Sequence, residues 1–346
     1  LNFNERIGNL RAYVNWKYRL NDDLTIVAGV QSQRVLFNNK QSFEPRFSAR
    51  WKASEKSSFN FGYGLHSSME QIYHYFANIE QADGSFTQPN RDLGLLKSHH
   101  FVAGYDRHFS KDLVGKVEVY YQHLYNLPVE NQLGSHYATI NETDEIEYYD
   151  LVNEGTGTNY GVGLTLQRYF ANDHYFLMNA SFYESTFEGL DGVERNTRFN
   201  GNYLFNLIGG KEFTQLGKKQ NKTIGVNAKL FMGGGLRVIP LLRDSEGAID
   251  VNPEEGQFWD YDKAYERSLE DIYTITLSAN YKVEKKNKTH EFFLYLENIT
   301  NNKGKLSEHY NATAPMQVGH ITQFGLLPNF MYRLYLVKSG FRRYPI

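Results

Sequence analysis

Two clusters of aromatic side chains are the strongest candidates for binding chemistry in this sequence. One is Tyr73-His-Tyr-Phe76 and the other is Phe258-Trp-Asp-Tyr261. Both fall in stretches without a repeating apolar pattern, which predicts loops. Aromatic rings in loops can stack on sugars, macrocycles or apolar ligand faces, but they can equally pack one loop on another. The residues for which we predict ligand binding are Tyr73, His74, Tyr75, Phe76, Trp259 and Tyr261.

The 11 histidines do not have the spacing of a metal site. His99 and His100 are adjacent, so on a strand they face opposite sides and cannot bind one ion together. No His-Glu-x-x-His pattern occurs. We predict no metal and no cofactor. Most histidines are interpreted as ordinary interfacial or internal residues, and His74, His136 and His309 are the loop positions from which a ligand could be reached.

Other polar motifs indicate structure more than chemistry. Acidic residues gather at 142–150 and 244–262, but neither stretch has the spacing of a calcium-binding EF-hand loop, so a solvated surface is the preferred interpretation. Gly233-Gly-Gly235 lacks the context of a phosphate-binding loop and predicts a strand bend where another backbone comes close. Because no motif singles out a Ser/His/Asp set, we predict that the chain is not an enzyme.

Composition narrows the class of protein. The 346 residues carry a net charge of -2, which gives no electrostatic reason to expect nucleic acid as a partner. There are 26 Tyr and 24 Phe but 8 Pro and no Cys, so disulfides and thiolate chemistry are excluded. The mean hydropathy is low, and no apolar run approaches the roughly 18 residues of a membrane helix. An aromatic-rich but polar chain of this kind is typical of a transmembrane β-barrel, where only alternate residues must be apolar.

Strict alternation of apolar and polar residues predicts the elements that position these side chains. In residues 272–282, Tyr273, Ile275 and Leu277 point one way while the intervening Thr, Ser and Asn residues point the other. The same period of two recurs at 10–20, 59–65 and 224–232. Such segments are about as long as a tilted membrane strand.

About thirteen strands follow one another as hairpins, with turns of a few residues alternating with longer loops. The four longest loops are expected near residues 67–98, 126–158, 240–268 and 300–326. Bacterial outer-membrane barrels have this asymmetry, with short periplasmic turns and long extracellular loops. We therefore predict an all-β fold, an antiparallel transmembrane β-barrel, with residues 1–346 forming a single domain.

An odd number of strands places the two chain ends on opposite sides of the membrane. Single-chain bacterial barrels have an even number of strands and both ends in the periplasm. Either one strand is miscounted or an N-terminal part is missing, and a start at Leu1 favours the second explanation.

Three motifs resemble TonB-dependent outer-membrane receptors. Leu296-Glu-Asn-Ile-Thr-Asn-Asn302 is similar to the signature that ends the penultimate strand of that family. Leu327-Pro-Asn-Phe-Met-Tyr-Arg-Leu-Tyr335 is similar to its last strand, and Tyr120-Tyr-Gln-His-Leu-Tyr-Asn-Leu-Pro128 to a common strand-to-loop segment. The chain departs from the family by continuing from 337 to 346 beyond the usual aromatic end.

The resemblance implies the C-terminal part of a 22-stranded barrel, without its N-terminal plug and first strands. It implies an active transporter in the outer membrane of a Gram-negative bacterium, which takes up a siderophore, cobalamin, glycan or peptide with energy from TonB. The implied partners are outer-membrane lipid, TonB through the plug, and the ligand, with a surface lipoprotein left open. The alternatives are a passive or selective porin-type channel, hinted at by Arg46, Arg50 and Lys52 on one strand, and an outer-membrane lipase or protease.

Overall fold

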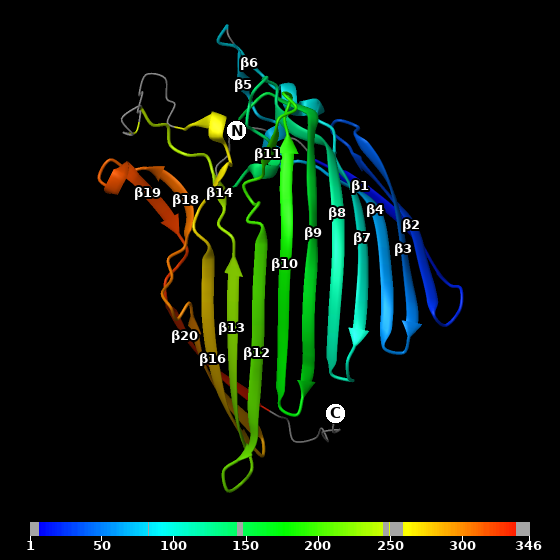
Figure 1. The fold of residues 1–346 in the computed structure, drawn as a ribbon, viewed down its shortest axis with the longest axis vertical. Coiled ribbons are helices and arrows are strands. Elements are labelled where there is room, and N and C mark those ends of the chain that lie inside the picture. Colours follow the sequence, from blue (N-terminus) through cyan, green and yellow to red (C-terminus); the bar gives the residue numbers. More distant parts are fainter. Residues whose placement is uncertain (1–6, 82, 144–147, 245–248, 250–258, 337–346) are drawn as a thin grey trace.

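The chain folds into one long, curved antiparallel sheet (Figure 1). The computed structural model describes residues 7–81, 83–143, 148–244, 249 and 259–336. Within these residues the sheet holds 14 strands, and 13 of them pair in chain order. The 13 strands are β1 (Asn9–Arg19), β2 (Leu24–Val35), β3 (Gln41–Ser54), β4 (Ser57–Ser68), β7 (Leu96–His108), β8 (Leu113–Glu130), β9 (Leu151–Ala171), β10 (His174–Glu188), β12 (Tyr203–Leu216), β13 (Lys222–Gly233), β16 (Ile272–Lys285), β17 (Lys288–Glu297) and β20 (Leu327–Leu336). The predicted succession of hairpins is confirmed.

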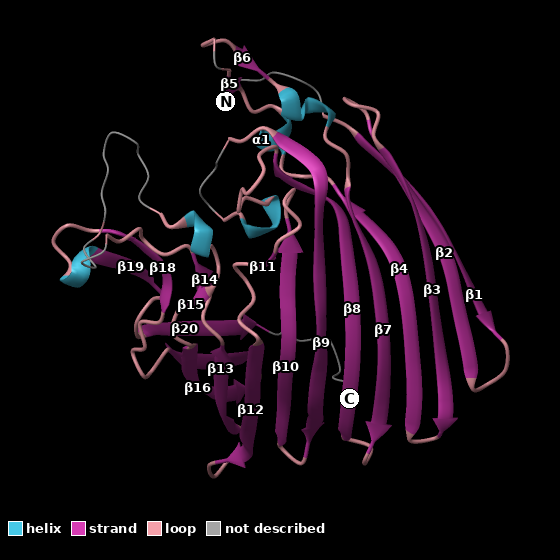
Figure 2. Cartoon of the chain, turned by 45° about the horizontal axis from the view of Figure 1, so that its top comes forward, coloured by secondary structure: helices cyan, strands magenta, loops and turns pink. Residues whose placement is uncertain are grey.

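Short turns and long loops lie at opposite ends of the sheet, as predicted (Figure 1). Small elements are confined to the long loops, and Figure 2 shows the helices gathered at that end. These elements are α1 (Ile72–Tyr75), β5 (Ile79–Glu80), β6 (Phe86–Thr87), β11 (Glu194–Asn196), β14 (Arg237–Val238), β15 (Arg267–Ser268), β18 (Lys305–Tyr310), β19 (Val318–Thr322) and the 3-10 turns Pro89–Asp92, Thr139–Asn141, Tyr261–Lys263 and Pro315–Gln317. Among the described residues, no helix is long and apolar enough to cross a membrane.

Residues on neighbouring strands pair so that apolar side chains meet apolar ones on one face of the sheet, and polar side chains meet polar ones on the other. One row across six strands is apolar and consists of Trp16, Ala28, Phe47, Tyr63, Phe101 and Tyr121. Another row across the same strands is mostly polar and consists of Arg19, Thr25, Arg50, Asn60, Gly104 and Glu118. The period of two in the sequence therefore divides the sheet into an apolar face and a polar face.

Aromatic rings form a band on the apolar face beside the short turns. Trp51 stacks on Phe59 with their ring centroids 5.6 Å apart, and Phe59 lies 5.0 Å from Tyr105. Trp16 and Tyr18 stack at 5.2 Å in the first strand. Aromatic rings near strand ends are typical of the girdle of a membrane barrel.

The sheet has two edges, which are β1 and β20. Each of these strands has one partner in the described part of the chain, so the sheet is an open trough there. Backbone hydrogen bonds are otherwise satisfied between neighbouring strands, which is the condition for a sheet to lie in lipid. Membership in a closed barrel of 22 strands stays a prediction.

The strands β8 and β9 are longer than the sequence pattern suggested. We expected a loop from 126 to 158, whereas β8 continues to Glu130 and β9 begins at Leu151. The pairing shifts register between Tyr125 and Leu127 and again between Leu127 and Val129. Asn126 has φ of 56°, a left-handed conformation that Asn tolerates. These bulges interrupt the period of two, so the sequence pattern predicts a loop where the two strands continue.

The glycines after β13 allow two close backbone approaches. A Cβ atom on Gly234 would lie 1.8 Å from the carbonyl oxygen of Gly201, and one on Gly235 would lie 2.0 Å from that of Leu269. A side chain at either position would collide with backbone, which cannot move aside as a flexible side chain can. The predicted close backbone approach is confirmed for Gly234 and Gly235, whereas a Cβ on Gly233 would make only ordinary contacts.

Candidate functional site

The long loops fold onto one another at one end of the sheet (Figure 2). The first long loop, residues 69–95, contains α1 and packs against the loop 131–150. Tyr75, Phe76 and Leu93 from the first loop form a buried cluster with Tyr137 and Leu151. Burial of several large apolar side chains gives the loops a core that reaches the sheet at Leu151, the first residue of β9.

The aromatic rings of this cluster pack in specific orientations. Phe37, from the turn between β2 and β3, lies edge-on to Tyr75 with the ring centroids 5.1 Å apart. The guanidinium of Arg91 lies 5.1 Å from the centroid of the Phe76 ring, a cation–π distance. Three connections of the sheet therefore meet around Tyr75 and Phe76.

A single carboxylate joins the first loop to the second. Glu142 Oε2 accepts hydrogen bonds from Tyr73 Oη and from His74 Nε2, both at 2.6 Å. Tyr137 Oη donates to Glu142 Oε1 at 3.4 Å. The side chains of His74 and Glu142 are 1% and 4% exposed, so the contact lies out of reach of bulk water. We call Tyr73, His74, Tyr137 and Glu142 the carboxylate joint.

Protonation in and beside the joint is set mainly by burial. Burial lowers the pKa of His74, against the opposing effect of the Glu142 carboxylate, so the imidazole is neutral at pH 7 and donates its Nε2 hydrogen. Burial raises the pKa of Glu70 to about 7, and the nearby Glu142 adds to the rise while a hydrogen bond with Thr139 opposes it. Burial also raises the pKa of Tyr73, followed by the effect of Glu142, so its hydroxyl remains a donor. Glu70 is therefore a group in this assembly that titrates near neutral pH.

The second aromatic segment contacts the loop 131–150 from the other side. Tyr261 stacks on His136 with ring centroids 4.2 Å apart and an interplanar angle of 13°. Burial lowers the pKa of His136 to about 4, and the positive charge of Arg195 adds to the effect, so the ring is neutral. Trp259 forms an isolated bridge with Leu241 within its own loop. The loop 131–150 is thus held between the two segments that the sequence singled out.

The six predicted ligand-binding residues divide into two groups. His74, Tyr75 and Phe76 are buried, with 1%, 0% and 2% of their surface exposed, and they hold loops together. Tyr73, Trp259 and Tyr261 are partly exposed at the loop end. This division favours loop packing for the buried three. Ligand binding by the six residues stays a prediction.

Several residues that hold the loops together had no recognisable signal in the sequence. Asn90 is fully buried, donates to the Tyr149 carbonyl oxygen at 2.7 Å and accepts from the Leu151 amide at 2.8 Å. Arg237 donates to the Asn200 carbonyl oxygen at 2.8 Å and to that of Glu266 at 2.9 Å, which joins two further loops. Such contacts join distant segments, so no local pattern announces them.

The acidic stretch at 142–150 was interpreted as solvated surface, and this was wrong for Glu142. Its side chain is buried, and it accepts hydrogen bonds from Tyr73 and His74 of the neighbouring loop and from Tyr137 of its own loop. Asp144, Glu145 and Glu147 lie outside the described residues, as do residues 245–248 and 250–258 of the second acidic stretch and the tail 337–346.

The histidines of β7 face opposite sides, as predicted. His99 stacks against Tyr63 and Tyr125 on the apolar face, with centroid distances of 6.1 and 5.3 Å. His100 lies 6.1 Å from His66 on the other face. No group of three or more His, Asp or Glu residues is arranged to hold a metal in the part of the chain that the structure describes.

The fold and the one-sided loop assembly agree with a known family. The family model described as "TonB dependent receptor-like, beta-barrel" matches residues 2–301. The chain belongs to this family. No curated protein is significantly similar to it in sequence.

Solved structures of TonB-dependent receptors share the fold of this receptor barrel. The ferric yersiniabactin uptake receptor FyuA from Yersinia pestis is 12% identical, with a TM-score of 0.62, and the match covers 94% of this chain and 45% of that one. The ferric-catecholate import receptor Fiu from Escherichia coli K12 is 12% identical at a TM-score of 0.61, over 94% and 45%. The pyoverdine receptor FpvA from Pseudomonas aeruginosa is 14% identical at 0.60, over 95% and 42%. The chain spans less than half the length of these receptors.

Proposed function

We propose that this chain is the wall and part of the extracellular loop assembly of an active outer-membrane transporter. The observation that carries the proposal is the family match across residues 2–301. The arrangement of the loops supports it, because all long loops lie at one end of a sheet whose other end has short turns. Family members are proteins of the Gram-negative outer membrane, and we assign the chain to that membrane on this ground.

The mechanism divides the work between a rigid wall and a loop assembly. The sheet satisfies its backbone groups within itself and presents an apolar face to lipid. The loops capture a scarce ligand at the outer surface. An N-terminal plug, implied by the family, would then respond to TonB and let the ligand pass along the polar face. In this scheme the chain supplies binding and passage rather than catalysis, and the family placement favours a transporter over an enzyme.

The ligand class that we propose is a small-molecule iron chelate. The three receptors named above are described by their binding or import of ferric yersiniabactin, ferric catecholates and pyoverdine. Tyr73, Trp259 and Tyr261 are the partly exposed aromatic residues that would contact such a ligand. Cobalamin, glycans and peptides are the other classes, and outer-membrane lipid and a surface lipoprotein are further proposed partners.

Uptake with and without energy coupling tests the proposal. Cells that carry the protein should accumulate a radiolabelled ferric siderophore, and accumulation should stop when TonB is deleted or a protonophore is added. Accumulation that persists after both treatments would identify a passive channel instead. The double variant Trp259→Ala/Tyr261→Ala should weaken ligand binding, whereas Phe324→Ala, which removes an exposed aromatic residue from a different loop, should not.

A further inference from the structure

Lysine is concentrated in two neighbouring short turns of the sheet. Lys218 and Lys219 lie between β12 and β13, and Lys222 is the first residue of β13. Lys285-Lys-Asn-Lys288 closes the hairpin of β16 and β17, and all six lysines are exposed. The charged residues of the other four short turns are Asp22 and Asp23, Glu55 and Lys56, Lys111 and Asp112, and Asp173. Excess positive charge at this end of the sheet is therefore confined to the two lysine-rich turns.

Hydrogen bonds hold the two lysine-rich turns side by side. The Glu284 amide donates to the Asn221 carbonyl oxygen at 2.9 Å, and Asn221 Nδ2 donates to the Glu284 carbonyl oxygen at 2.6 Å. Lys222 pairs with Val283 of the neighbouring strand in the register of the sheet. Adjacent strands are about 4.8 Å apart, so the lysines of one turn lie near those of the other.

Strand register places three of the lysines on the apolar face of the sheet. Ile224 and Tyr281 pair on that face. Lys222 is two residues from Ile224, and Lys285 is four residues from Tyr281, so both lysines share the face. Lys288 pairs with Lys285 and shares it as well. The Nζ atom of Lys222 lies 6.0 Å from the centroid of the Tyr281 ring, in agreement with the register. We call Lys222, Lys285 and Lys288 the lysine rim.

A row of apolar side chains borders the lysine rim on the same face. The row crosses five strands and consists of Phe213, Ile224, Tyr281, Phe292 and Tyr332. The rings of Phe292 and Tyr332 lie 5.0 Å apart between centroids. Aromatic side chains near strand ends mark the membrane interface in a barrel. The rim lies two to four residues farther toward the turns, or about 7–14 Å along the strands, which places it in the headgroup layer.

The fold brings two charges of the rim together. Lys285 and Lys288 are directly opposite each other in an antiparallel pair, where Cβ atoms are about 5 Å apart. Like charges at such positions destabilise the pairing of the strands. The one carboxylate of the two turns, Glu284, pairs with Lys282 at 3.0 Å. Among the residues that the structure describes, no ion pair includes a lysine of the rim.

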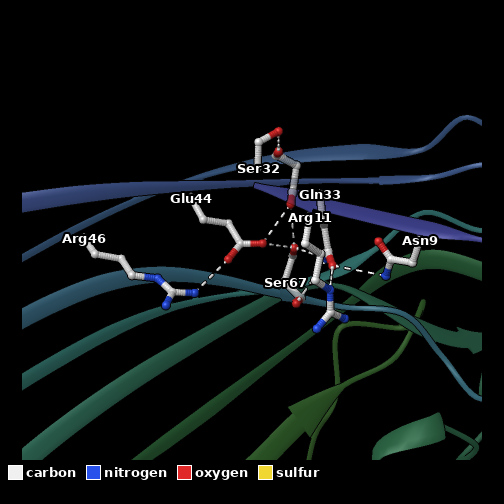
Figure 3. Close-up of polar contacts among 8 residues, drawn as sticks. Asn9, Arg11, Ser32, Gln33, Glu44, Arg46 and Ser67 are labelled. Carbon is white, nitrogen blue, oxygen red and sulfur yellow. Dashed lines mark hydrogen bonds and ion pairs between the residues drawn. The ribbon is translucent and has the colours of Figure 1, made fainter. Parts of the chain in front are cut away.

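Arg46 is an example of a cation whose countercharge the chain supplies itself. Its guanidinium pairs with the buried carboxylate of Glu44 at 3.0 Å (Figure 3). Ser42 and Ser67 donate hydrogen bonds to the same carboxylate at 2.8 and 2.5 Å. This arginine is neutralised within the fold, whereas the lysine rim presents its charges to the surroundings.

Closure of the barrel would leave the lipid-facing side of the rim as it is. β12, β13, β16 and β17 each pair on both sides within the described sheet. Further strands would join at the edges β1 and β20, and a plug would occupy the inside of the barrel. The side on which the three lysines and the apolar row lie is the outside, which is available to lipid in a complete barrel.

We propose that the lysine rim binds the phosphate group of an anionic phospholipid in the periplasmic leaflet. The acyl chains lie against the apolar row, and the ammonium groups donate charge-assisted hydrogen bonds to the phosphate. A phosphate that bridges Lys285 and Lys288 also relieves their repulsion. The inference rests on the proposed location in the outer membrane, and it gives the lipid partner a chemical class and a site.

Native mass spectrometry of the full polypeptide, purified from outer membranes in detergent, tests the site. The probes are short-chain phosphatidylglycerol and phosphatidylcholine, which differ in the net charge of the headgroup. The wild type should bind phosphatidylglycerol more tightly. Lys285→Gln/Lys288→Gln should weaken that binding by about 10-fold or more, since each lysine beside an anionic headgroup contributes about a factor of five. Lys285→Arg/Lys288→Arg should restore most of the affinity.

Thermal unfolding gives a second measurement that separates lipid binding from a structural role. Without anionic lipid, the double glutamine variant should be at least as stable as the wild type, because the repulsion between the two lysines is gone. With phosphatidylglycerol, the wild type should gain more stability than the variant, because the lipid binds the folded state. A purely structural role for the lysines would make the variant less stable under both conditions.

Two controls accompany these measurements. Lys56→Gln/Lys111→Gln removes two exposed lysines from other short turns and should leave the lipid preference unchanged. Glycerol 3-phosphate, a headgroup without acyl chains, should not displace phosphatidylglycerol, since it cannot contact the apolar row. The characteristic shift of a folded barrel between unheated and heated samples in gel electrophoresis shows that each variant is folded.

Three outcomes would overturn the site. They are equal binding of the two phospholipids by the wild type, an equal loss of phosphatidylglycerol binding in Lys56→Gln/Lys111→Gln, and unchanged binding in Lys285→Gln/Lys288→Gln. Displacement by glycerol 3-phosphate would show that the rim takes a soluble anion instead of a lipid. The assay needs no TonB and no transported ligand, so its failure would leave energy-dependent uptake standing, and failed uptake would leave lipid binding standing.

Discussion

The Nε2 atom of His74 lies 2.6 Å from the Oε2 atom of Glu142, although 68 residues separate the two in the sequence. The same oxygen accepts the hydroxyl of Tyr73 at 2.6 Å. Both donors belong to the loop 69–95 and the acceptor to the loop 131–150. One buried carboxylate therefore helps to fix the relative position of the two loops, beside the apolar cluster around Tyr75 and the hydrogen bonds of Asn90.

Replacing Glu142 with Ala should loosen both loops without unfolding the sheet. The change leaves the buried donor of His74 without an acceptor, which costs about 1–3 kcal/mol, and it removes the partner of the partly exposed Tyr73 hydroxyl. Amide hydrogen exchange at 72–76 and 137–141 should accelerate by about 10-fold or more, while exchange in the sheet strands stays the same. Glu80→Ala, an exposed carboxylate in the same loop, is the matched control. Unchanged loop exchange in Glu142→Ala would show that the joint is not what holds the loops.

Ionisation of Glu70 should make the loop assembly less stable as the pH rises from about 4.5 to about 7. Burial raises the pKa of this carboxyl from 4.5 to about 7, so the folded assembly binds a proton that the opened state has released. The free energy that stabilises the folded loops against opening falls by on the order of 3 kcal/mol across this pH interval. Hydrogen exchange of the loops, corrected for intrinsic rates, measures it.

The variant Glu70→Gln isolates this contribution. It should match the wild type near pH 4.5, where Glu70 is protonated, and have more stable loops than the wild type at pH 8. His74 acts with the opposite sign, because burial lowers its pKa and its contribution is lost as the pH falls below about 6.5. The pH dependence that remains in Glu70→Gln should therefore favour the loops at higher pH. A variant with the same pH profile as the wild type would assign the dependence to another group.

The order of hairpins and the two faces of the sheet were predictable because both follow from a local period of two. That period breaks at Asn126, where a positive φ and two register shifts extend β8 into what was expected to be a loop. The fate of the loop aromatic residues was not predictable, because an exposed and a buried Tyr look the same in sequence. Tyr75 is buried by segments more than 60 residues away, such as Tyr137, and a single sequence does not record that pairing.

Adding a methyl group at Gly234 should be strongly destabilising. The new Cβ would lie 1.8 Å from the carbonyl oxygen of Gly201, and both sides of this contact are backbone. Relief requires separating the ends of β12 and β13 from their loops, so Gly234→Ala should reduce thermal stability and the yield of folded barrel. Gly62→Ala is the matched control, because no atom lies within 4 Å of its Cβ position, and it should be near neutral. Equal behaviour of the two variants would exclude the close backbone approach as a constraint.

The motif after β17 should depend on its first asparagine for structural reasons. Asn298 is 1% exposed, has φ of 50° and donates to the carbonyl oxygens of Asn302 and Phe324 at 2.7 and 2.8 Å. Its Oδ1 atom accepts the amide of Asn302 at 3.1 Å. One side chain thus closes the turn and joins it to the segment that leads into β20.

Three substitutions at this position separate its roles. Asn298→Gly keeps the backbone conformation and loses the hydrogen bonds, Asn298→Asp keeps the acceptor and loses the two donors, and Asn298→Ala loses both the hydrogen bonds and the favourable conformation. Ala should therefore be the most damaging, by about 1–2 kcal/mol more than Gly, which is the cost of holding a non-glycine residue in the left-handed region. Thermal unfolding of the purified barrel gives the order, and an Ala variant as stable as Gly would show that the backbone conformation adds no cost. Because β20 pairs only with β17 in the described chain, the damage should appear first as faster amide exchange in 327–336.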